Sequence, residues 1–247
     1  FTTQQEREQK NQEYVKEISI YEITDFPDHP FKVKMDDKML ETIESVRDHG
    51  VLVPALVREK PTGGYEMISG HRRKMACELA GRDKIPCIVR NLTDDEAIVV
   101  MVDSNLQREK ILPSEKAFAY KMKLDAMKRQ GKRTDLTSTP LGQKSGKYSV
   151  EILGEQVGES KSQIQRYIRL TNLIPEILEK VDDDKIGMRP AVELSYLSKE
   201  EQELLYDAME SEACTPSHDQ AIQMRNLSKE GKLNEDIIMV IMSQEKP

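Results

Sequence analysis

The chain is poor in the residues that build disulfide scaffolds, zinc sites and membrane spans. Its 247 residues include no tryptophan, three cysteines and four histidines. Cys77, Cys87 and Cys214 lie far apart and form no Cys-x-x-Cys pair, so we expect reduced, structural thiols. The histidines are scattered too, which argues against a metal held by protein side chains alone. No apolar run approaches the roughly 18 residues of a membrane-spanning helix, so we expect a cytoplasmic protein with no membrane partner.

Charge is abundant and unevenly distributed. The formal net charge is −7, which by itself argues against binding to nucleic acid. Residues 121–170, however, hold eleven Lys and Arg against five Asp and Glu, a local charge of +6 on an otherwise acidic chain. Because attraction to phosphates is local, this pattern is typical of a DNA-binding module. A lysine-rich solvated helix followed by a loop would give the same pattern.

The first half of the chain alternates between helix and strand patterns. Apolar residues recur at helical spacing over 36–49, and a second helix is expected from His71 to Ala80. Thr93 and Glu96 have the spacing of a capping box and open a third helix that runs toward Asn105. Runs rich in β-branched residues predict strands at 51–57, 65–68 and 85–89, and a short one around Ile18 and Ile20. These patterns predict a small mixed α/β domain.

The second half predicts helices only. An amphipathic helix is expected over 113–130, followed by a hinge or flexible loop over 131–147 that is rich in Gly, Ser, Thr and Lys. The predicted organisation is a flexible arm (1–14), a mixed α/β domain (15–111), a linking helix and loop (112–147) and an all-α domain (148–247). The expected fold class is α+β, with the sheet confined to the first half.

The stretch from Gly64 to Arg73 has the chemistry of a phosphate-binding turn. An expected strand ends at Gly70 and a helix follows directly. Backbone N–H groups, the helix dipole and the guanidinium groups of Arg72 and Arg73 would therefore all face one anion. Adjacent arginines are also common on a plain solvated helix face, so this motif alone leaves both interpretations open.

Residues 149–170 have the spacing of a helix-turn-helix. Such a unit needs a small residue in the first helix, a glycine at the turn and an apolar residue of the second helix facing the core. Gly154, Gly158 and Ile164 stand at these places. The exposed side chains of the second helix, which would contact base edges or phosphates, are then Ser160, Lys161, Ser162, Gln163, Gln165 and Arg166. An ordinary helical hairpin with a polar outer face is the alternative.

Three ordered motifs resemble the N-terminal domain of ParB/RepB-type partition proteins. Residues Gly70 to Arg73 read Gly-His-Arg-Arg where the family has Gly-Glu-Arg-Arg. Residues Ser104 to Arg108 read Ser-Asn-Leu-Gln-Arg where it has Glu-Asn-x-Gln-Arg. The segment 49–58 is similar to the family strand that precedes the first box, and the helix-turn-helix follows in the family's order.

This resemblance implies a domain that binds CTP with magnesium, and a DNA clamp that is loaded at a palindromic, centromere-like site. It implies that the nucleotide contacts Gly70, His71, Arg72, Arg73, Asn105 and Arg108, and that magnesium contacts Asn105 and Ser104. His71 and Ser104 stand where the family usually has glutamate. Because a serine hydroxyl brings no negative charge, we expect weaker magnesium binding. Nucleotide binding is thus better supported than CTP hydrolysis, and whether the chain is an enzyme stays open.

The resemblance also implies the partners and the cellular role. They are double-stranded DNA and a ParA-type ATPase, with a role in segregating a plasmid, mobile element or chromosome at the nucleoid or plasmid. The family's self-associating C-terminal module is expected to be absent, because Pro247 closely follows the apolar segment 237–242.

Other functions compete with partition. One alternative is a KorB-like transcriptional regulator that uses the same helix-turn-helix at operators. Enzymes of related fold, a nuclease or a phosphotransferase, are a further alternative. The sequence lacks the acidic cluster that a nuclease needs for a metal pair, and Ser104 stands where a phosphotransferase would need a carboxylate.

Overall fold

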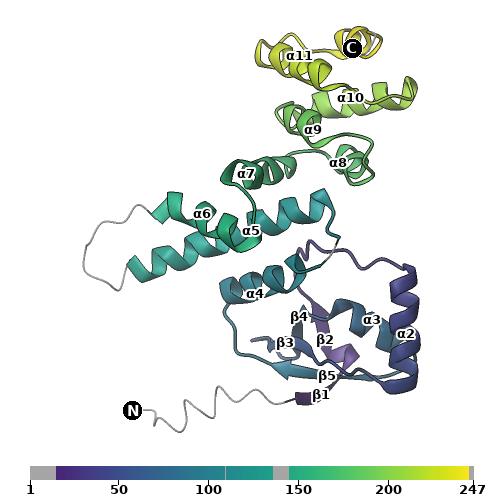
Figure 1. Cartoon of the computed structure of the whole chain (residues 1–247), viewed down its shortest axis with the longest axis vertical. Coiled ribbons are helices and arrows are strands. Elements are labelled where there is room, and N and C mark those ends of the chain that lie inside the picture. Colours follow the sequence, from purple (N-terminus) through teal and green to yellow (C-terminus); the bar gives the residue numbers. More distant parts are fainter. Residues whose placement is uncertain (1–14, 109, 136–144, 245–247) are drawn as a thin grey trace. The chain divides into compact units, whose positions relative to one another are not determined.

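The computed structural model describes residues 15–108, 110–135 and 145–244. The chain forms two compact units that divide between Gln107 and Arg108 (Figure 1). The first unit combines a sheet with helices, and the described part of the second contains helices alone, which confirms the α+β class. Within the described ranges, no helix is both long and apolar enough to cross a bilayer.

A five-stranded mixed sheet forms the centre of the first unit. Its strands lie in the order β1 (Val15–Ser19), β5 (Lys84–Val89), β3 (Ala55–Glu59), β4 (Tyr65–Ser69) and β2 (Ile23–Asp25). The pairs β1/β5 and β3/β4 are antiparallel, whereas β5/β3 and β4/β2 are parallel. A short 3-10 turn, η1 (Ile20–Glu22), connects β1 to β2.

Helices cover both faces of this sheet. α2 (Asp37–His49) and α3 (His71–Leu79) share an apolar core with strand residues that include Val57, Met67 and Cys87. α4 (Asp94–Leu106) packs against β4. Neighbouring side chains on a strand point to opposite faces, so Met67 faces the α2/α3 core and Glu66 faces the other side.

Burial raises the pKa of the Cys87 thiol to about 12, and all three cysteines are free, as predicted.

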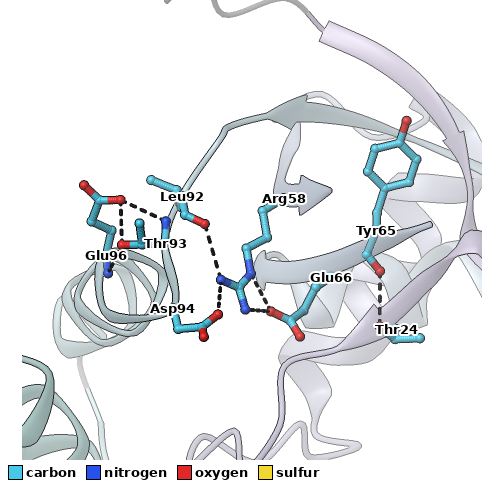
Figure 2. A network of polar contacts seen from close by, with 8 residues as sticks. All are labelled: Thr24, Arg58, Tyr65, Glu66, Leu92, Thr93, Asp94 and Glu96. Carbon is cyan, nitrogen blue, oxygen red and sulfur yellow. Dashed lines mark hydrogen bonds and ion pairs between the residues drawn. The ribbon is translucent and has the colours of Figure 1, made fainter. Parts of the chain in front are cut away.

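Arg58 on β3 ties the start of α4 to the sheet (Figure 2). Its Nε donates to Glu66 of β4 at 2.6 Å, and its Nη1 donates to Asp94 at 2.7 Å and to the carbonyl of Leu92 at 3.3 Å. Burial opposes the charge on the guanidinium, but its hydrogen bonds with Asp94 and Glu66 outweigh this and raise the pKa of Arg58. The helix that carries Ser104 therefore begins at a fixed point on the sheet.

Gly70 joins β4 to α3 where the backbone passes very close to β3. Its φ of 116° lies in the left-handed region. A Cβ at this position would lie 2.8 Å from the Cβ of Ala55 and 3.2 Å from its Cα. Any side chain would force the turn away from the sheet, so both the conformation and the space require glycine.

The described part of the second unit contains eight helices. They are α5 (Pro113–Asp135), α6 (Ser145–Val157), α7 (Lys161–Leu170), α8 (Pro175–Asp182), α9 (Met188–Leu194), α10 (Lys199–Ser211), α11 (His218–Lys229) and α12 (Glu235–Met242). α5 packs against α6, α7 and α8. Side chains of α8 to α12 form one apolar core that also includes Ala117 of α5 and Leu170 of α7.

Most element positions agree with the sequence predictions. α2 and the Thr93/Glu96 capping box are present as predicted. β3 begins at Ala55 and not at residue 51, because the carbonyls of the preceding loop accept hydrogen bonds from a side chain of α3. The loop predicted over 131–147 was too long, since α5 continues to Asp135 and α6 begins at Ser145. The rest of that loop and the arm predicted over 1–14 lie outside the described residues.

We predict that Gly70→Ala lowers the free energy of unfolding by about 2–4 kcal/mol, because left-handed strain and a close contact that the strand cannot avoid both add to the cost. Gly63→Ala is a matched control: its φ is 89°, but nothing lies within 4 Å of the added Cβ. It should cost only the strain, about 1 kcal/mol. Urea unfolding measures both variants, and equal losses would contradict the proposed role of Ala55.

Candidate nucleotide-binding turn and helix-turn-helix

The first turn of α3 presents its backbone N–H groups without a capping side chain. Gly70 occupies the N-cap position, and the first turn holds no Asp or Glu. By contrast, Asp36 caps α2, and Thr93 caps α4, whose first turn carries three acidic residues. The positive end of α3 is therefore not neutralised by its own helix, so an anion at this turn would be stabilised.

Arg72 reaches from this turn to Asp36. Its Nη2 donates to Oδ1 of Asp36 at 2.8 Å, and the same carboxylate accepts from the amide of Met39 at 2.8 Å. The hydrogen bond from Arg72 is the main cause that holds the pKa of Asp36 below its usual value. The pair is partly exposed, with 28% of the Arg72 side chain and 48% of the Asp36 side chain accessible to solvent. Such pairs contribute little to stability. A more highly charged anion could therefore take the place of the Asp36 carboxylate as the partner of Arg72.

Arg73 points the other way and supports the loop before β3. Its Nη1 donates to the carbonyls of Val53 at 2.5 Å and Pro54 at 2.6 Å. Burial lowers the pKa of its guanidinium, and its Nη2 lies 3.3 Å from where a Cβ of Gly70 would be. Arg73 thus holds the loop against the turn and keeps one donor group beside Gly70.

His71 is the first residue of α3, and its ring contacts that of His29 in a tilted arrangement, with the centroids 3.9 Å apart. The Nδ1 atom of His29 lies 2.9 Å from the carbonyl oxygen of Phe31. One turn further along α3, Lys74 pairs with Asp25 at 2.8 Å. The sequence motif indicated His71 but not His29, whose segment has no periodic pattern that would mark it.

Ser104 and Asn105 lie in the last turn of α4. Both side chains donate to the carbonyl of Met101, Ser104 Oγ at 2.9 Å and Asn105 Nδ2 at 2.8 Å. Neither carries a charge, and among the described residues no group of three His, Cys, Asp or Glu side chains could hold a metal ion. These side chains alone therefore do not fit a magnesium site. Arg108 belongs to the second unit, and its role at the nucleotide stays a prediction.

The predicted helix-turn-helix is formed by α6 and α7. Gly158 adopts a φ of 69° at the turn. A Cβ on Gly154 would lie 2.7 Å from the carbonyl oxygen of Glu159, so the turn can pass over α6 only where no side chain is present. Ile164 of α7 is fully buried. These three residues have the packing roles that their spacing predicted.

Side chains of α5 hold this turn in position. Glu159 accepts hydrogen bonds from Lys116 Nζ at 2.8 Å and from the Tyr120 hydroxyl at 3.3 Å. Tyr120 also contacts Tyr167 of α7 edge to face, with the centroids 5.7 Å apart. Burial and the charge of Glu159 raise the pKa of Tyr120, so its hydroxyl stays protonated and able to donate. α5, which the sequence predicted as a linking helix, is thus the third helix of the unit around the turn.

The polar side chains predicted on α7 differ in exposure. The exposed ones on the helix itself are Ser162, Gln165 and Arg166. Lys161 and Gln163 are half-buried, so the prediction that they are exposed was too simple. Lys161 pairs with Glu151 of α6 at 3.5 Å. Exposed Ser160 caps α7 by accepting from the amide of Gln163 at 3.2 Å, which gives it a structural role.

A cation–π contact anchors the C-terminal end of α7. Arg169 donates from Nε and Nη2 to Oγ and the carbonyl of Ser195, at 3.1 Å and 2.9 Å. Its guanidinium lies 3.8 Å from the ring centroid of Tyr196, and that of Arg225 on α11 lies 3.9 Å from the same centroid. Arg225 also pairs with Glu193 at 2.5 Å. These contacts link the orientation of α7 to α9 and α11, through residues that no sequence motif marked.

Comparison with known proteins assigns both units. Residues 4–106 match the model of the ParB N-terminal domain, and residues 142–226 match that of the ParB HTH domain. The chain belongs to the ParB family. The first ParB match contains the Gly70 turn and ends at the last residue of α4, and the second contains α7 together with the Tyr196 contact.

Relatives of this ParB chain include the nucleoid occlusion protein of Listeria monocytogenes serotype 4b, 35% identical over 175 residues, and stage 0 sporulation protein J of Bacillus subtilis, 34% identical over 178 residues. The alignments cover 71% and 72% of this chain but 55% and 56% of the relatives. The chain thus spans about half the length of the curated relatives it matches. A solved pNOB8-like ParB N-domain shares the fold, with a TM-score of 0.51 at 13% identity, over 94% of this chain and 98% of the other.

Proposed function

We propose that this ParB-family chain is a DNA-binding partition protein that reads a palindromic site through α7 and binds a cytidine nucleotide at the Gly70–Arg73 turn. One observation carries the proposal: an arginine-bearing helix start without a cap and a firmly supported helix-turn-helix occur in the same chain. The partners would be double-stranded DNA and a ParA-type ATPase, at the nucleoid or a plasmid.

The chemistry of α7 supports the DNA part of the proposal. Gln165 and Arg166 are exposed on this helix and Gln163 is half-buried. Their amide and guanidinium groups are of the kind that forms paired hydrogen bonds with base edges in the major groove. Ser160 and Lys161 lie at its N-terminal end, where the helix dipole favours contact with phosphates. The contacts of Glu159 and Arg169 at the two ends of α7 hold the helix in a fixed orientation, which base reading requires.

The charge balance at the Gly70 turn supports the nucleotide part. A polyphosphate brings more negative charge than the single carboxylate of Asp36, so it would take Arg72 from Asp36 while accepting from the N–H groups of the first turn of α3. Nη2 of Arg73 lies beside the same turn. Magnesium, when bound, would neutralise phosphate oxygens, but Ser104 and Asn105 add no charge to hold it. We therefore propose that hydrolysis is slow or absent.

The names of the relatives favour a second candidate function. One is a sporulation protein and another a nucleoid occlusion protein, so nucleoid occlusion is the alternative to partition. A KorB-like regulator would use the same α7. Mapping the protein along DNA in cells separates a clamp from a KorB-like regulator, because a clamp spreads from its site whereas a simple repressor stays at its operator.

We predict that Arg166→Ala and Gln163→Ala each weaken binding to the cognate site by about 1–3 kcal/mol, because each removes a contact to a base edge. Lys161→Ala should weaken binding to all sequences alike, because a phosphate contact carries no sequence information. The cognate site is first selected from random duplexes, and binding is then measured on cognate and scrambled duplexes at one salt concentration. Equal losses on both duplexes for Arg166→Ala and Gln163→Ala would contradict base reading.

For the nucleotide, we predict opposite effects of the two partners in the Arg72–Asp36 pair. Arg72→Gln should weaken CTP binding about 10-fold or more, because a charge-assisted hydrogen bond is lost. Asp36→Asn should strengthen it several-fold, because asparagine still caps α2 but no longer competes for Arg72. Arg47→Gln, an exposed arginine in the last turn of α2, is the control and should change nothing. Calorimetry at low salt measures all three variants. Weaker binding by Asp36→Asn would contradict the proposal that the nucleotide takes Arg72 from Asp36.

A further inference from the structure

The paired rings of His29 and His71 lie directly at the start of α3. Their centroids are 3.9 Å apart and their planes are inclined by 38°. His71 is the residue next to Gly70, whereas His29 comes from the segment between β2 and α2. Two imidazole side chains, whose ordinary pKa lies near neutral pH, therefore touch at the turn where a polyphosphate would bind.

Charged groups surround this pair. Asp25, at the end of β2, lies close enough for the charges of both histidines to act on it, and Lys74 on the next turn of α3 pairs with it at 2.8 Å. Burial acts to raise the pKa of Asp25, but the hydrogen bond and charge of Lys74, and then the charges of His71 and His29, lower it overall. Asp36 at the start of α2 is paired with Arg72. The carboxylates of Asp25 and Asp36 are thus each paired with a cation.

Repulsion between the two rings opposes a charge on both histidines at once, whereas the carboxylate of Asp25 attracts such a charge. Two imidazolium rings in contact repel each other, so the pair takes up protons as a coupled unit. The positive end of the α3 dipole and the cations Arg72 and Lys74 oppose protonation further. A bound polyphosphate reverses this balance, because it brings several negative charges to the N-terminal end of the same helix.

We propose that His29 and His71 form a proton-linked part of the nucleotide site, so that a polyphosphate and a proton bind together. This inference rests on the proposed nucleotide function and adds His29 to the site. By linkage, a proton taken up on binding makes the affinity rise as the pH falls through the range in which the pair titrates. Each pH unit in that range should tighten binding by up to about tenfold per proton taken up.

The test compares CTP binding by the full chain with binding by His71→Gln and His29→Asn, from pH 8.5 to pH 6. The terminal phosphate of the nucleotide gains a proton of its own near pH 6, but it does so equally with every variant. The ratio of affinities between the unmodified protein and each variant therefore isolates the histidines. His49→Gln is the matched control, because His49 is an exposed histidine in the last turn of α2.

Calorimetry in two buffers of different ionisation enthalpy counts the protons taken up directly, which a merely structural role of the histidines would not change. We expect greater uptake by the unmodified protein and His49→Gln than by the two pair variants, and an affinity ratio that grows to about tenfold at pH 6. CTP binding with the same proton uptake in all four proteins would overturn the histidine proposal alone. No CTP binding at any pH would overturn the proposed nucleotide function as well.

Discussion

The contact between the Gly70 backbone and Ala55 sets the shape of the candidate nucleotide site. A hydrogen atom is the only substituent that fits between them, since a Cβ on Gly70 would lie 2.8 Å from that of Ala55. The strand therefore fixes the turn, and no capping side chain is needed to start α3. The N–H groups of its first turn thus remain available to an anion. Arg73 strengthens the arrangement by holding the loop before β3 from the helix side.

The helix-turn-helix of the second unit also depends on a glycine that allows a close backbone contact. Gly154 leaves room for the Glu159 carbonyl, which would lie 2.7 Å from a Cβ. The side chain of Glu159 is in turn held by Lys116 and Tyr120 of α5. In both units, a glycine permits a close backbone approach and a buried or half-buried cation secures it. The side chains that follow each glycine are then presented from a rigid frame.

These close backbone contacts also explain which features of the fold and the site could be predicted from the sequence. A close approach needs glycine at one position, so Gly70, Gly154 and Gly158 stand out in the sequence, and local capping marks the start of α4 equally well. The pairs Arg72–Asp36, Lys116–Glu159 and His29–His71 join residues that lie 36, 43 and 42 positions apart, and no local pattern connects them. For the same reason the sequence did not show that Lys161 and Gln163 are half-buried, because their exposure depends on how α7 packs against its neighbours.

The central claim is that the first turn of α3 holds the nucleotide phosphates. Hydrogen exchange of the full chain, followed by mass spectrometry with and without CTP and magnesium, tests it most directly because it reports on backbone N–H groups. The account predicts slower exchange in peptides that cover residues 70–75, and unchanged exchange in α11, which has no role in the proposed nucleotide site. Slower exchange elsewhere in the chain, with residues 70–75 unaffected at saturating CTP, would contradict it.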